Sequence, residues 1–364
     1  MELALESSAE TQHAEGRSLR ASIVIVNYNA KEKLLRCLES VLSSAGADCE
    51  VILVDNASSD GTAELIETDF SEVTLIRSQT NLGFGAGNNL AAKRARGRYL
   101  IFLNPDTLVE QGWLEALIGL LEKNVQAGLV TSKILLADQP HRINACGNSV
   151  HFTGLTLCRG LGESREAYHH VEEVNAISGA SFAARYQLVE ALNGFDEDMF
   201  LYMEDTDLSW RARLLGWHCL YTPDSVVLHH YELRIGPLKV FYQERNRYLM
   251  LLKTLRWPTL LILVPSLLLT EVITWGFVMY NDRENLKNKL RAYNWVRCNW
   301  SEIMRKRRQT QAHRCVPDRE LLRNTTFRVD FNQASNGFTG KLAQFLFDPL
   351  FLVLKAVVMT LVWW

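Results

Sequence analysis

The sequence predicts an α/β fold, with a mostly parallel sheet wrapped by helices and a helical appendage toward the C-terminal end. Two observations lead to this prediction. Short apolar segments alternate with helical patterns through the first two-thirds of the chain, and an almost continuous apolar run follows at residues 257–280. Strands that alternate with helices over short connections favour parallel pairing with right-handed crossovers. A chain of 364 residues can bury a full core and still carry an appendage.

The apolar and amphipathic periodicities define the expected elements. The expected strands are 22–26, 50–54, 73–77, 99–103, 128–136, 219–222 and 225–228. The expected helices are 32–43, 90–95, 113–123, 204–215 and 241–253. Residues 138–176 hold several glycines and are expected to form a loop-rich insertion over the edge of the sheet, and residues 177–182 are expected to lead into a helix.

Composition excludes some classes of protein. The seven cysteines are odd in number and lack C-x-x-C spacing, which favours reduced thiols over a disulfide framework or a zinc site. The first fifteen residues are polar or acidic without an apolar core, so we expect no signal peptide and a mobile leader over residues 1–20. The formal net charge is −2, and we expect no nucleic-acid partner.

The stretch Tyr99–Thr107, YLIFLNPDT, combines a buried strand with a polar turn. Pro105 cannot donate to a sheet ladder, so the strand is expected to end before it. Asn104 and Asp106 are then left at the carboxyl end of the strand, the edge where open α/β sheets bind ligands. Their oxygen atoms suit a hard cation such as Mg²⁺ or Mn²⁺. We therefore expect Asp106 to hold a cation that holds a diphosphate.

Other polar features fall on the same predicted edge. Asp55 ends the second strand, where a carboxylate can accept from a base or a ribose hydroxyl. The glycine-rich turn 81–89, NLGFGAGNN, lets the backbone approach a ligand and opens a helix whose amino end favours anions. Asp205 lies in the first turn of a helix, and His229 follows a strand, where a neutral imidazole could join a Mn²⁺ site. Each residue alone also has an ordinary structural explanation, but their shared edge favours a site.

Several ordered segments resemble those of family 2 glycosyltransferases, and most closely the rhamnosyltransferase-like branch that builds bacterial surface polysaccharides. The resemblance covers residues 22–255. Its segments are SIVIVNYN, VILVDNASSDGT, NLGFGAGNN, YLIFLNPD, SGASFAAR, GFDEDMFLYMEDTDLSWRARLLGW and the P-D-S-V-V-L-H stretch that ends at His229. The resemblance implies the GT-A fold and an inverting, metal-dependent sugar transfer.

The resemblance also implies roles for individual residues. Asp55 would bind the nucleoside of the donor, and Asp106, as the last residue of the D-x-D motif, would ligate Mg²⁺ or Mn²⁺. His229 would be the second protein ligand of the metal, and Asp205 of the E-D pair would be the catalytic base. The other residues expected at the donor are Asn27, Tyr28, Asn29, Asn81, Gly85 and Asn104.

Two departures from the family pattern affect the expected chemistry. Asn104 stands where the D-x-D motif has its first carboxylate, which leaves fewer negative charges on the metal and gives Asn104 at most an outer-shell role. The Q-x-x-R-W motif of processive synthases is absent, and residues 242–246, YQERN, stand near its place. A non-processive enzyme that adds one sugar is therefore expected.

The segments after residue 237 predict membrane association. We expect a leader over 1–20, a GT-A catalytic domain over 21–237 and a helical membrane-association region over 238–364. That region contains an apolar segment at 257–280, a basic amphipathic segment at 281–314 and an apolar segment at 342–364.

The apolar run 257–280 could cross a bilayer by its length, but Pro265 and Glu271 interrupt it. Segment 281–314 has ten Lys/Arg and three Asp/Glu, a local charge of +7, and the positive-inside rule places it on the cytosolic side. A re-entrant hairpin or in-plane helices on the cytoplasmic face of the inner membrane meet both constraints. The alternative is a second soluble helical subdomain with 257–280 as its core helix. One helical face of the basic segment is expected to carry Leu286, Leu290, Tyr293, Val296, Trp300 and Ile303.

The resulting hypothesis is a transferase that moves one sugar, with rhamnose as a candidate, from a dTDP- or UDP-sugar to a hydroxyl of a lipid-linked saccharide in surface polysaccharide synthesis. Two alternatives stay open. A sugar nucleotidyltransferase also uses a parallel sheet, a metal and a nucleotide. A membrane-bound assembly scaffold with a degenerate site would explain Asn104 in place of a carboxylate.

Overall fold

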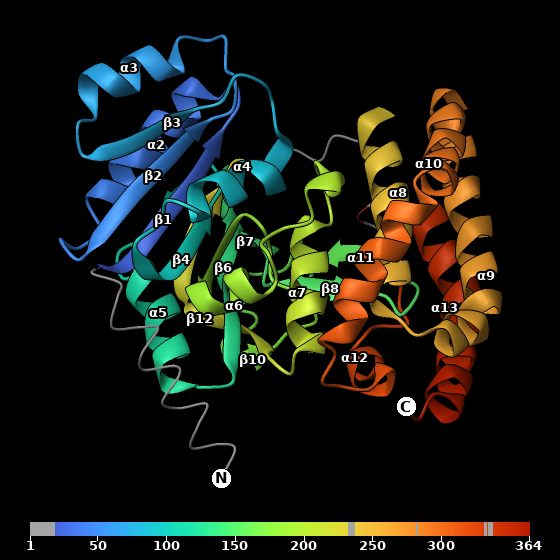
Figure 1. Cartoon of the computed structure of the whole chain (residues 1–364). Helices are drawn as coiled ribbons and strands as arrows, with labels where there is room; N and C mark the ends of the chain where they lie inside the picture. Colours follow the sequence, from blue (N-terminus) through green and yellow to red (C-terminus); the bar gives the residue numbers. More distant parts are fainter. Residues whose placement is uncertain (1–18, 232–236, 282, 331–332, 334–337) are drawn as a thin grey trace.

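The computed structural model describes residues 19–364 apart from 232–236, 282, 331–332 and 334–337 (Figure 1). Most of the predicted leader therefore lies outside the described residues. The strands are β1 (Leu19–Asn27), β2 (Cys49–Asp55), β3 (Val73–Arg77), β4 (Gly97–Leu103), β5 (Thr107–Val109), β6 (Ala127–Leu136), β7 (Gln139–Ala145), β8 (Asn148–Val150), β9 (Thr156–Cys158), β10 (Glu172–Glu173), β11 (Ser181–Arg185) and β12 (His218–His229).

The helices fall into two groups along the chain. Those that cover the sheet are α2 (Lys31–Leu42), α3 (Thr62–Asp69), α4 (Gly83–Ala92), α5 (Trp113–Lys123), α6 (Tyr186–Ala191), the short η1 (Glu197–Met199) and α7 (Glu204–Leu214). Those of the appendage are α8 (Pro237–Thr254), α9 (Trp257–Asn281), the short η2 (Arg283–Asn285), α10 (Leu286–Cys298), α11 (Trp300–Ala312), α12 (Asp318–Arg323) and α13 (Phe338–Leu361).

The main sheet has the order β10-β12-β6-β11-β4-β1-β2-β3, with β5 paired to β12 and β7 to β6. Strands β1 to β4 pair in parallel, and β6 pairs in parallel with β12. Because β11 is antiparallel to both β4 and β6, these two strands point the same way. The carboxyl ends of β1, β2, β4 and β12 therefore meet at one edge of the sheet, as the sequence predicted.

Both faces of the sheet are covered by helices. On one face α2 and α5 bury residues such as Leu38 and Leu117 against the apolar side chains of β1 and β4. On the other face α4, α6 and α7 contribute Ala91, Leu188 and Leu208 to a second core. Most strands are apolar on both sides because both faces are buried, which is why they read as continuous apolar runs in the sequence.

Strand β11 was not predicted. It lies in the middle of the sheet, where Ala183 faces Ile101 of β4 and Val130 of β6. Its sequence, SFAAR, is short and rich in alanine, which has a low strand propensity, so burial between two strands decides its conformation. The prediction of a loop-rich insertion over 138–176 was incomplete for a similar reason, because four short strands, β7 to β10, lie within it.

Two other elements differ from the prediction. The expected strands at 219–222 and 225–228 are one strand, β12, with a register shift between Thr222 and Val226. The glycine-rich turn is itself the first part of helix α4, which begins at Gly83 with φ +76°. A Cβ on Gly83 would lie 2.3 Å from the carbonyl oxygen of Phe200, so this close approach requires glycine.

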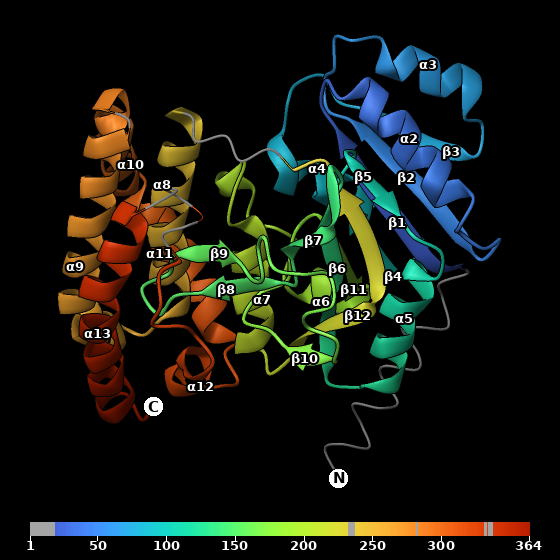
Figure 2. The ribbon, with the colours of Figure 1, turned by 180° about the vertical axis from the view of Figure 1, so that it is seen from behind.

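The appendage shares a core with the first part of the chain. Trp210 and Leu214 of α7 pack in one cluster with Leu249 of α8 and Phe351 of α13. Strands β8 and β9 lie between the sheet and the appendage helices (Figure 2). Helices α9 and α13 lie side by side at the outer edge in both views (Figures 1 and 2).

Helix α9 is continuous over 25 residues, so of the two arrangements expected for 257–280 the re-entrant hairpin is wrong, and in-plane helices stay a prediction. Pro265 lies on the exposed side of the helix, where its missing amide costs least. Glu271 faces inward and pairs with Arg247 of α8 and, at 3.0 Å, with Lys289 of α10.

The basic segment is not the continuous amphipathic helix that we expected. It divides at Asn299 into α10 and α11, and the expected apolar face is lost: Leu290 is 56% exposed whereas Ile303 is 1% exposed. Part of its positive charge points into the protein, since Lys289 and Arg307 are buried. The basic residues that remain exposed are Arg283, Lys287, Arg291, Arg297, Arg305 and Arg308.

Candidate active site

The strand pairings bring the predicted site residues to one edge. Asn27 ends β1 directly beside Asp55, which ends β2. Asn104 follows β4, and its amide donates to the carbonyl oxygen of Ala180 at 3.0 Å, just before β11. His229 ends β12 at the same edge, because β12 runs parallel to β6.

The short strand β5 brings Asp106 and His229 together. β5 begins at Thr107 and pairs antiparallel with β12, so that Thr107 faces His229. The amide of His230 also donates to the carbonyl oxygen of Asp106 at 3.0 Å. As a result Nε2 of His229 lies 3.2 Å from Oδ1 of Asp106. Two residues separated by more than a hundred positions thus form one pair, as the sequence predicted for the metal ligands.

A third residue sets the orientation of His229. Nδ1 of its ring lies 2.8 Å from Oδ1 of Asn144 in β7. With the Nδ1 proton donated to Asn144, Nε2 faces the carboxylate of Asp106, where it can donate a second proton to Asp106 or, once deprotonated, offer a lone pair to a cation. Two acceptors this close require a proton or a cation between them, and an imidazole with a carboxylate is a donor set that fits Mn²⁺. Burial alone would raise the pKa of Asp106, but His229 and Lys33 hold it below its ordinary value, so the carboxylate is charged.

The opposite end of the edge presents buried acceptors. Asp55 is 4% exposed, and its Oδ2 accepts from the amide of Ser58 at 3.3 Å. Its Oδ1 and the Oδ1 of Asn27 have no hydrogen-bond partner among the described residues. An orphaned buried acceptor is costly, so these oxygens fit a ligand that donates hydrogen bonds.

The remaining residues expected at the donor differ in their surroundings. Asn29 adopts a left-handed conformation, with φ 51°, and its Oδ1 accepts from the amide of Ser59 at 2.8 Å, while the neighbouring Tyr28 is half exposed. Oδ1 of Asn81 accepts from Nδ2 of Asn56 at 3.0 Å. This bond supports the start of α4.

Gly85 has a structural role in helix packing, and its expected contact with the donor stays a prediction. It is buried, and a Cβ there would lie 3.0 Å from Cβ of Phe195. The absence of a side chain thus allows α4 to pack closely on the segment around Phe195, whose ring stacks edge-on against Phe84 at 5.6 Å.

Asp205 is half-buried in the first turn of α7 and is held by donors from three residues. Its Oδ2 accepts from the amide of Gly179 at 2.9 Å and from Nδ2 of Asn148 at 3.0 Å, and its Oδ1 accepts from the amide of Thr206 at 2.6 Å. Burial raises the pKa of Asp205 above its ordinary value, although the bonds from Gly179, Thr206 and Asn148 favour the charged form. A carboxylate with a raised pKa is a better proton acceptor.

The adjacent Glu204 is 7% exposed, and its Oε2 has no hydrogen-bond partner among the described residues. Burial and the negative charge of Asp205 raise the pKa of Glu204 to about 8. The environment of Glu204 therefore favours its protonated form, which avoids two adjacent negative charges in the first turn of α7.

The segment between Ser178 and Ser181 connects the two halves of the site. Gly179 donates to Asp205, and the next residue, Ala180, accepts from the amide of Asn104. Asp205 thus lies beside the turn that carries Asp106. The sequence did not indicate the residues that orient this arrangement, Asn144 and Asn148, because they lie in the segment that was expected to be irregular.

Comparison with known proteins gives the family. Residues 22–143 match the family described as "Glycosyl transferase family 2", and residues 99–284, about half of the chain, match "Glycosyl transferase family group 2". The chain belongs to glycosyltransferase family 2. It is therefore a glycosyltransferase, and the family expected from the sequence motifs is confirmed.

Curated relatives of this glycosyltransferase act in glycan synthesis. An N-acetylglucosaminyl-diphospho-decaprenol L-rhamnosyltransferase of Mycobacterium tuberculosis is 28% identical over 232 residues, which are 57% of this chain and 75% of the relative. A poly-beta-1,6-N-acetyl-D-glucosamine synthase of Staphylococcus epidermidis is 26% identical over 223 residues, which are 60% of this chain but half of that longer protein.

Solved structures confirm that the glycosyltransferase has the GT-A fold. GalNAc-T7, determined with UDP, GalNAc and Mn²⁺, matches with a TM-score of 0.53 at 18% identity and covers 64% of this chain and 47% of its own. Residues 1–349 of S. aureus TarS, determined with UDP-GlcNAc, match with a TM-score of 0.53 at 16% identity and cover 75% of this chain and 79% of their own. At these identities the similarity extends to the fold alone.

Proposed function

We propose that this glycosyltransferase moves one sugar, with inversion, from a nucleotide-diphosphate donor to a hydroxyl of a lipid-linked saccharide. The observation that supports the proposal is the placement of a carboxylate with a raised pKa, Asp205, beside the turn that carries the Asp106–His229 pair. A base and a diphosphate site on either side of one sugar are what an inverting displacement needs.

In the proposed step Asp205 accepts the proton of the acceptor hydroxyl while the acceptor oxygen bonds to the anomeric carbon. The bond between that carbon and the diphosphate oxygen breaks, and its electron pair leaves with the nucleoside diphosphate. Gly179, Asn148 and Thr206 orient the carboxylate through their hydrogen bonds. Base catalysis of this kind contributes about 10²–10⁴-fold to the rate.

At the donor, Asp55 and Asn27 would accept hydrogen bonds from the nucleoside through their free Oδ1 atoms. Asp106 and His229 would hold Mn²⁺ or Mg²⁺, with Asn104 at most in its outer shell, and the cation when bound supplies positive charge for the leaving diphosphate. The histidine ligand favours Mn²⁺ over Mg²⁺. The Mn²⁺ in one structural neighbour with this fold supports a divalent cation.

The proposed acceptor follows from two observations. The rhamnosyltransferase relative is named for a diphospho-decaprenol substrate. In addition, α9 and α13 contain stretches, Trp257–Met279 and Leu342–Leu361, that are long and apolar enough to cross a membrane. Only 22% of the most apolar part of the first stretch and 11% of that of the second are buried. Core helices of a soluble subdomain would be mostly buried.

We propose that residues 21–237 are the catalytic part and that residues 238–364 rest on the cytoplasmic face of the membrane. The exposed apolar residues form a stripe along α9: Leu261, Val264, Leu268, Val272 and Met279. Because Glu271, which lies next to this stripe, pairs with Arg247 of α8 and Lys289 of α10, an in-plane position leaves these ion pairs intact.

The test is a panel of nucleotide sugars, including dTDP-rhamnose and UDP-sugars, scored by thermal shift of the full chain with and without Mn²⁺. One donor is expected to raise Tm only with the cation, and product analysis with that donor is expected to show sugar transfer with release of the nucleoside diphosphate. Release of pyrophosphate would instead indicate a nucleotidyltransferase, and no response to any nucleotide would indicate a scaffold with a degenerate site.

A further inference from the structure

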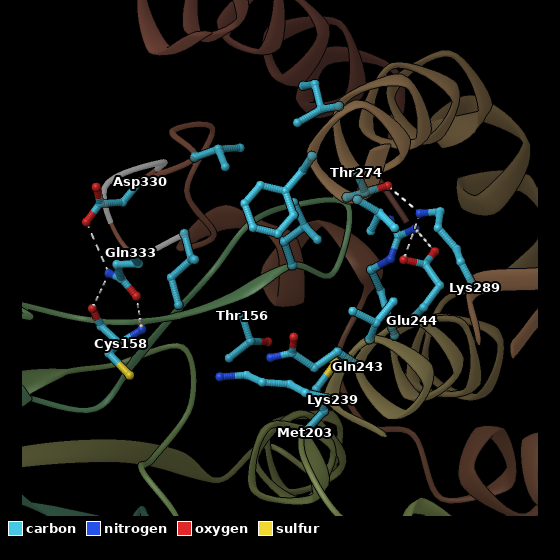
Figure 3. Close-up of a pocket in the computed structure, with 18 of the residues that line it drawn as sticks. Thr156, Cys158, Met203, Lys239, Gln243, Glu244, Thr274, Lys289, Asp330 and Gln333 are labelled. Carbon is cyan, nitrogen blue, oxygen red and sulfur yellow. Dashed lines mark hydrogen bonds and ion pairs between the residues drawn. The ribbon is translucent and has the colours of Figure 1, made fainter. Parts of the chain in front are cut away.

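A cavity of about 250 Å³ lies between the candidate active site and the appendage (Figure 3). One side is formed by β9 and the residues at the start of α7, and the other by α8, α9 and α10. None of the residues assigned above to the donor, the metal or the base lines it.

The cavity is nevertheless next to those residues. Cys158 lines it and pairs in the β8–β9 ladder with Asn148, which donates to Asp205. Tyr231 also lines it, and its ring centroid lies 5.8 Å from that of His229. A molecule in the cavity would therefore reach the candidate base on one side and the metal pair on the other.

Helix α9 presents apolar side chains to the cavity on one side and to the exposed stripe on the other. Ile273, Phe277 and Val278 line the cavity, while Val272 and Met279, on the same two turns of α9, are exposed on its outer side. One helix thus separates the cavity from the surface that we place on the membrane. The cavity is smaller than the roughly 300–1,000 Å³ typical of small-molecule sites, so it fits one part of a longer ligand.

Among the described residues, one cation that lines the cavity has no anionic partner. Arg247 and Lys289 line it, but both pair with Glu244, at 2.5 and 3.1 Å, and with Glu271. Lys239 forms no ion pair with any described residue, and its ammonium lies 5.5 Å from the centre of the Tyr202 ring. In Figure 3 its amino group points into the cavity near Thr156 and Gln243.

A half-buried ammonium that lacks a counter-charge is costly unless a ligand supplies one. An apolar wall beside a single unpaired cation matches a molecule with an anionic group joined to a hydrocarbon chain. A soluble nucleotide has the anionic group without the chain, and a neutral lipid has the chain without the anionic group.

We propose that this cavity binds the diphosphate and the first isoprenoid units of the lipid-linked acceptor, with Lys239 at the phosphate and Ile273, Phe277 and Val278 against the chain. The inference rests on the proposed function, because it assumes a lipid-linked acceptor. The inference adds an entry route for the acceptor. The lipid would enter between the sheet and α9 from the membrane side, and its saccharide would extend toward Asp205.

The test measures binding of farnesyl diphosphate, farnesol and inorganic pyrophosphate to the full chain in mild detergent with EDTA present. We expect farnesyl diphosphate to bind without metal and more tightly than either of the others. Lys239→Gln should weaken the binding of farnesyl diphosphate at least tenfold and leave the binding of farnesol unchanged. Phe277→Ser should weaken the binding of farnesyl diphosphate and the binding of farnesol to a similar extent. Lys287→Gln, at an exposed lysine of α10, is the matched control and should change neither.

Several results would overturn the proposal. They are failure of the wild-type protein to bind farnesyl diphosphate, equal affinity in Lys239→Gln, pyrophosphate binding as tight as that of farnesyl diphosphate, and binding that needs Mn²⁺ and is displaced by UDP. The last result would place the ligand at the donor site. UDP binding with Mn²⁺ is measured separately on each variant, so loss of the donor function is distinguishable from loss of the acceptor site.

Discussion

Nζ of Lys253 lies 2.7 Å from Oδ1 of Asp207, and this ion pair joins α8 of the appendage to α7, the helix whose first turn carries the candidate base. Lys253 also pairs with Asp196, which is 9% exposed. Since Trp210 and Leu214 of α7 lie in the same apolar cluster as the appendage helices, we expect the two parts of the chain to unfold together.

Lys253→Met tests this connection. The substitution leaves Asp207 and Asp196 buried with less compensating charge, and removal of one partner from a buried ion pair costs about 3–5 kcal/mol. Because Arg211 still pairs with Asp207 and Lys306 still pairs with Asp196, we expect the free energy of unfolding in urea to fall by less than this amount but clearly more than in a surface control. Arg305→Ala is the matched control, because its pair with Glu302 is at the surface, where water and salt screen it, and should contribute far less. Equal losses in the two variants would contradict the structural role of Lys253.

The ion pairs of Asp196 predict that the stability of the fold depends on pH. Burial alone would raise the pKa of Asp196, but Lys253 and Lys306 hold it well below its ordinary value of 3.8. A carboxylate with a lowered pKa stabilises the fold above that ordinary value, and the contribution is lost as the pH falls below it. Tm should therefore drop more steeply in the wild type than in Lys253→Met as the pH falls below 3.8. Parallel curves would show that Asp196 is not held by this pair.

Asp205→Asn should lower kcat by about 10²–10⁴-fold while the affinity for the donor stays within a factor of two, since the amide cannot accept the proton. Thermal shift with the donor and Mn²⁺ serves as the control for binding. Retention of wild-type kcat would exclude Asp205 as the base.

The raised pKa of Asp205 makes a separate prediction about pH. The base acts in its charged form, so kcat/KM should rise with pH through a pKa above the ordinary 3.8 of aspartate and then level off. The measurement is a pH–rate profile of the wild-type enzyme with the metal held in excess. A profile that is already level at pH 4 would show that burial does not raise the pKa of the catalytic group.

Asn144→Leu probes the orientation of His229. Without Asn144 as the partner of Nδ1, neither the orientation of the His229 ring nor its tautomer is fixed. Mutation of such partners typically lowers metal affinity 10–100-fold. Titration of Mn²⁺ in the presence of UDP measures the effect. His230→Gln is the control, because its backbone amide and not its ring contacts Asp106. Unchanged Mn²⁺ affinity in Asn144→Leu would mean that the ring is positioned by other contacts.

The exposed apolar stripe predicts binding to lipid. The double variant Leu268→Asp with Phe345→Asp introduces charges on the outer sides of α9 and α13, where these residues are 62% and 77% exposed. We expect it to sediment with anionic vesicles several-fold less than the wild type at unchanged Tm. Val125→Asp, at a 75% exposed valine outside the appendage, should sediment as the wild type does. Equal sedimentation of all three proteins would argue against these helices as the membrane surface.

The sequence predicted the elements whose signal is local. The apolar runs of β1 to β4 and β6 and the amphipathic periods of α2 and α5 are each visible within a short window, and the polar residues that end the strands follow from them. Strand β11 could not be predicted in this way, because its conformation depends on burial between β4 and β6.

Within the site the same distinction holds. Asp106 and His229 were expected to meet, and β5 brings them together. Asn144 and Asn148 were not expected, because each acts only through a contact with a residue distant in the sequence: Asn144 with His229, and Asn148 with Asp205. The inward direction of Lys289 and Arg307 was missed for the same reason, since a basic residue in a sequence does not show where its carboxylate or carbonyl partner lies.

The apolar outer side of α9 and α13 has a kinetic consequence. An enzyme adsorbed through these helices meets its acceptor by lateral diffusion in two dimensions, so its rate would depend on the mole fraction of acceptor in the lipid and not on the amount per volume of solution. Dilution of the acceptor with inert lipid at constant bulk concentration would then slow turnover, whereas the soluble donor would continue to obey ordinary saturation in three dimensions.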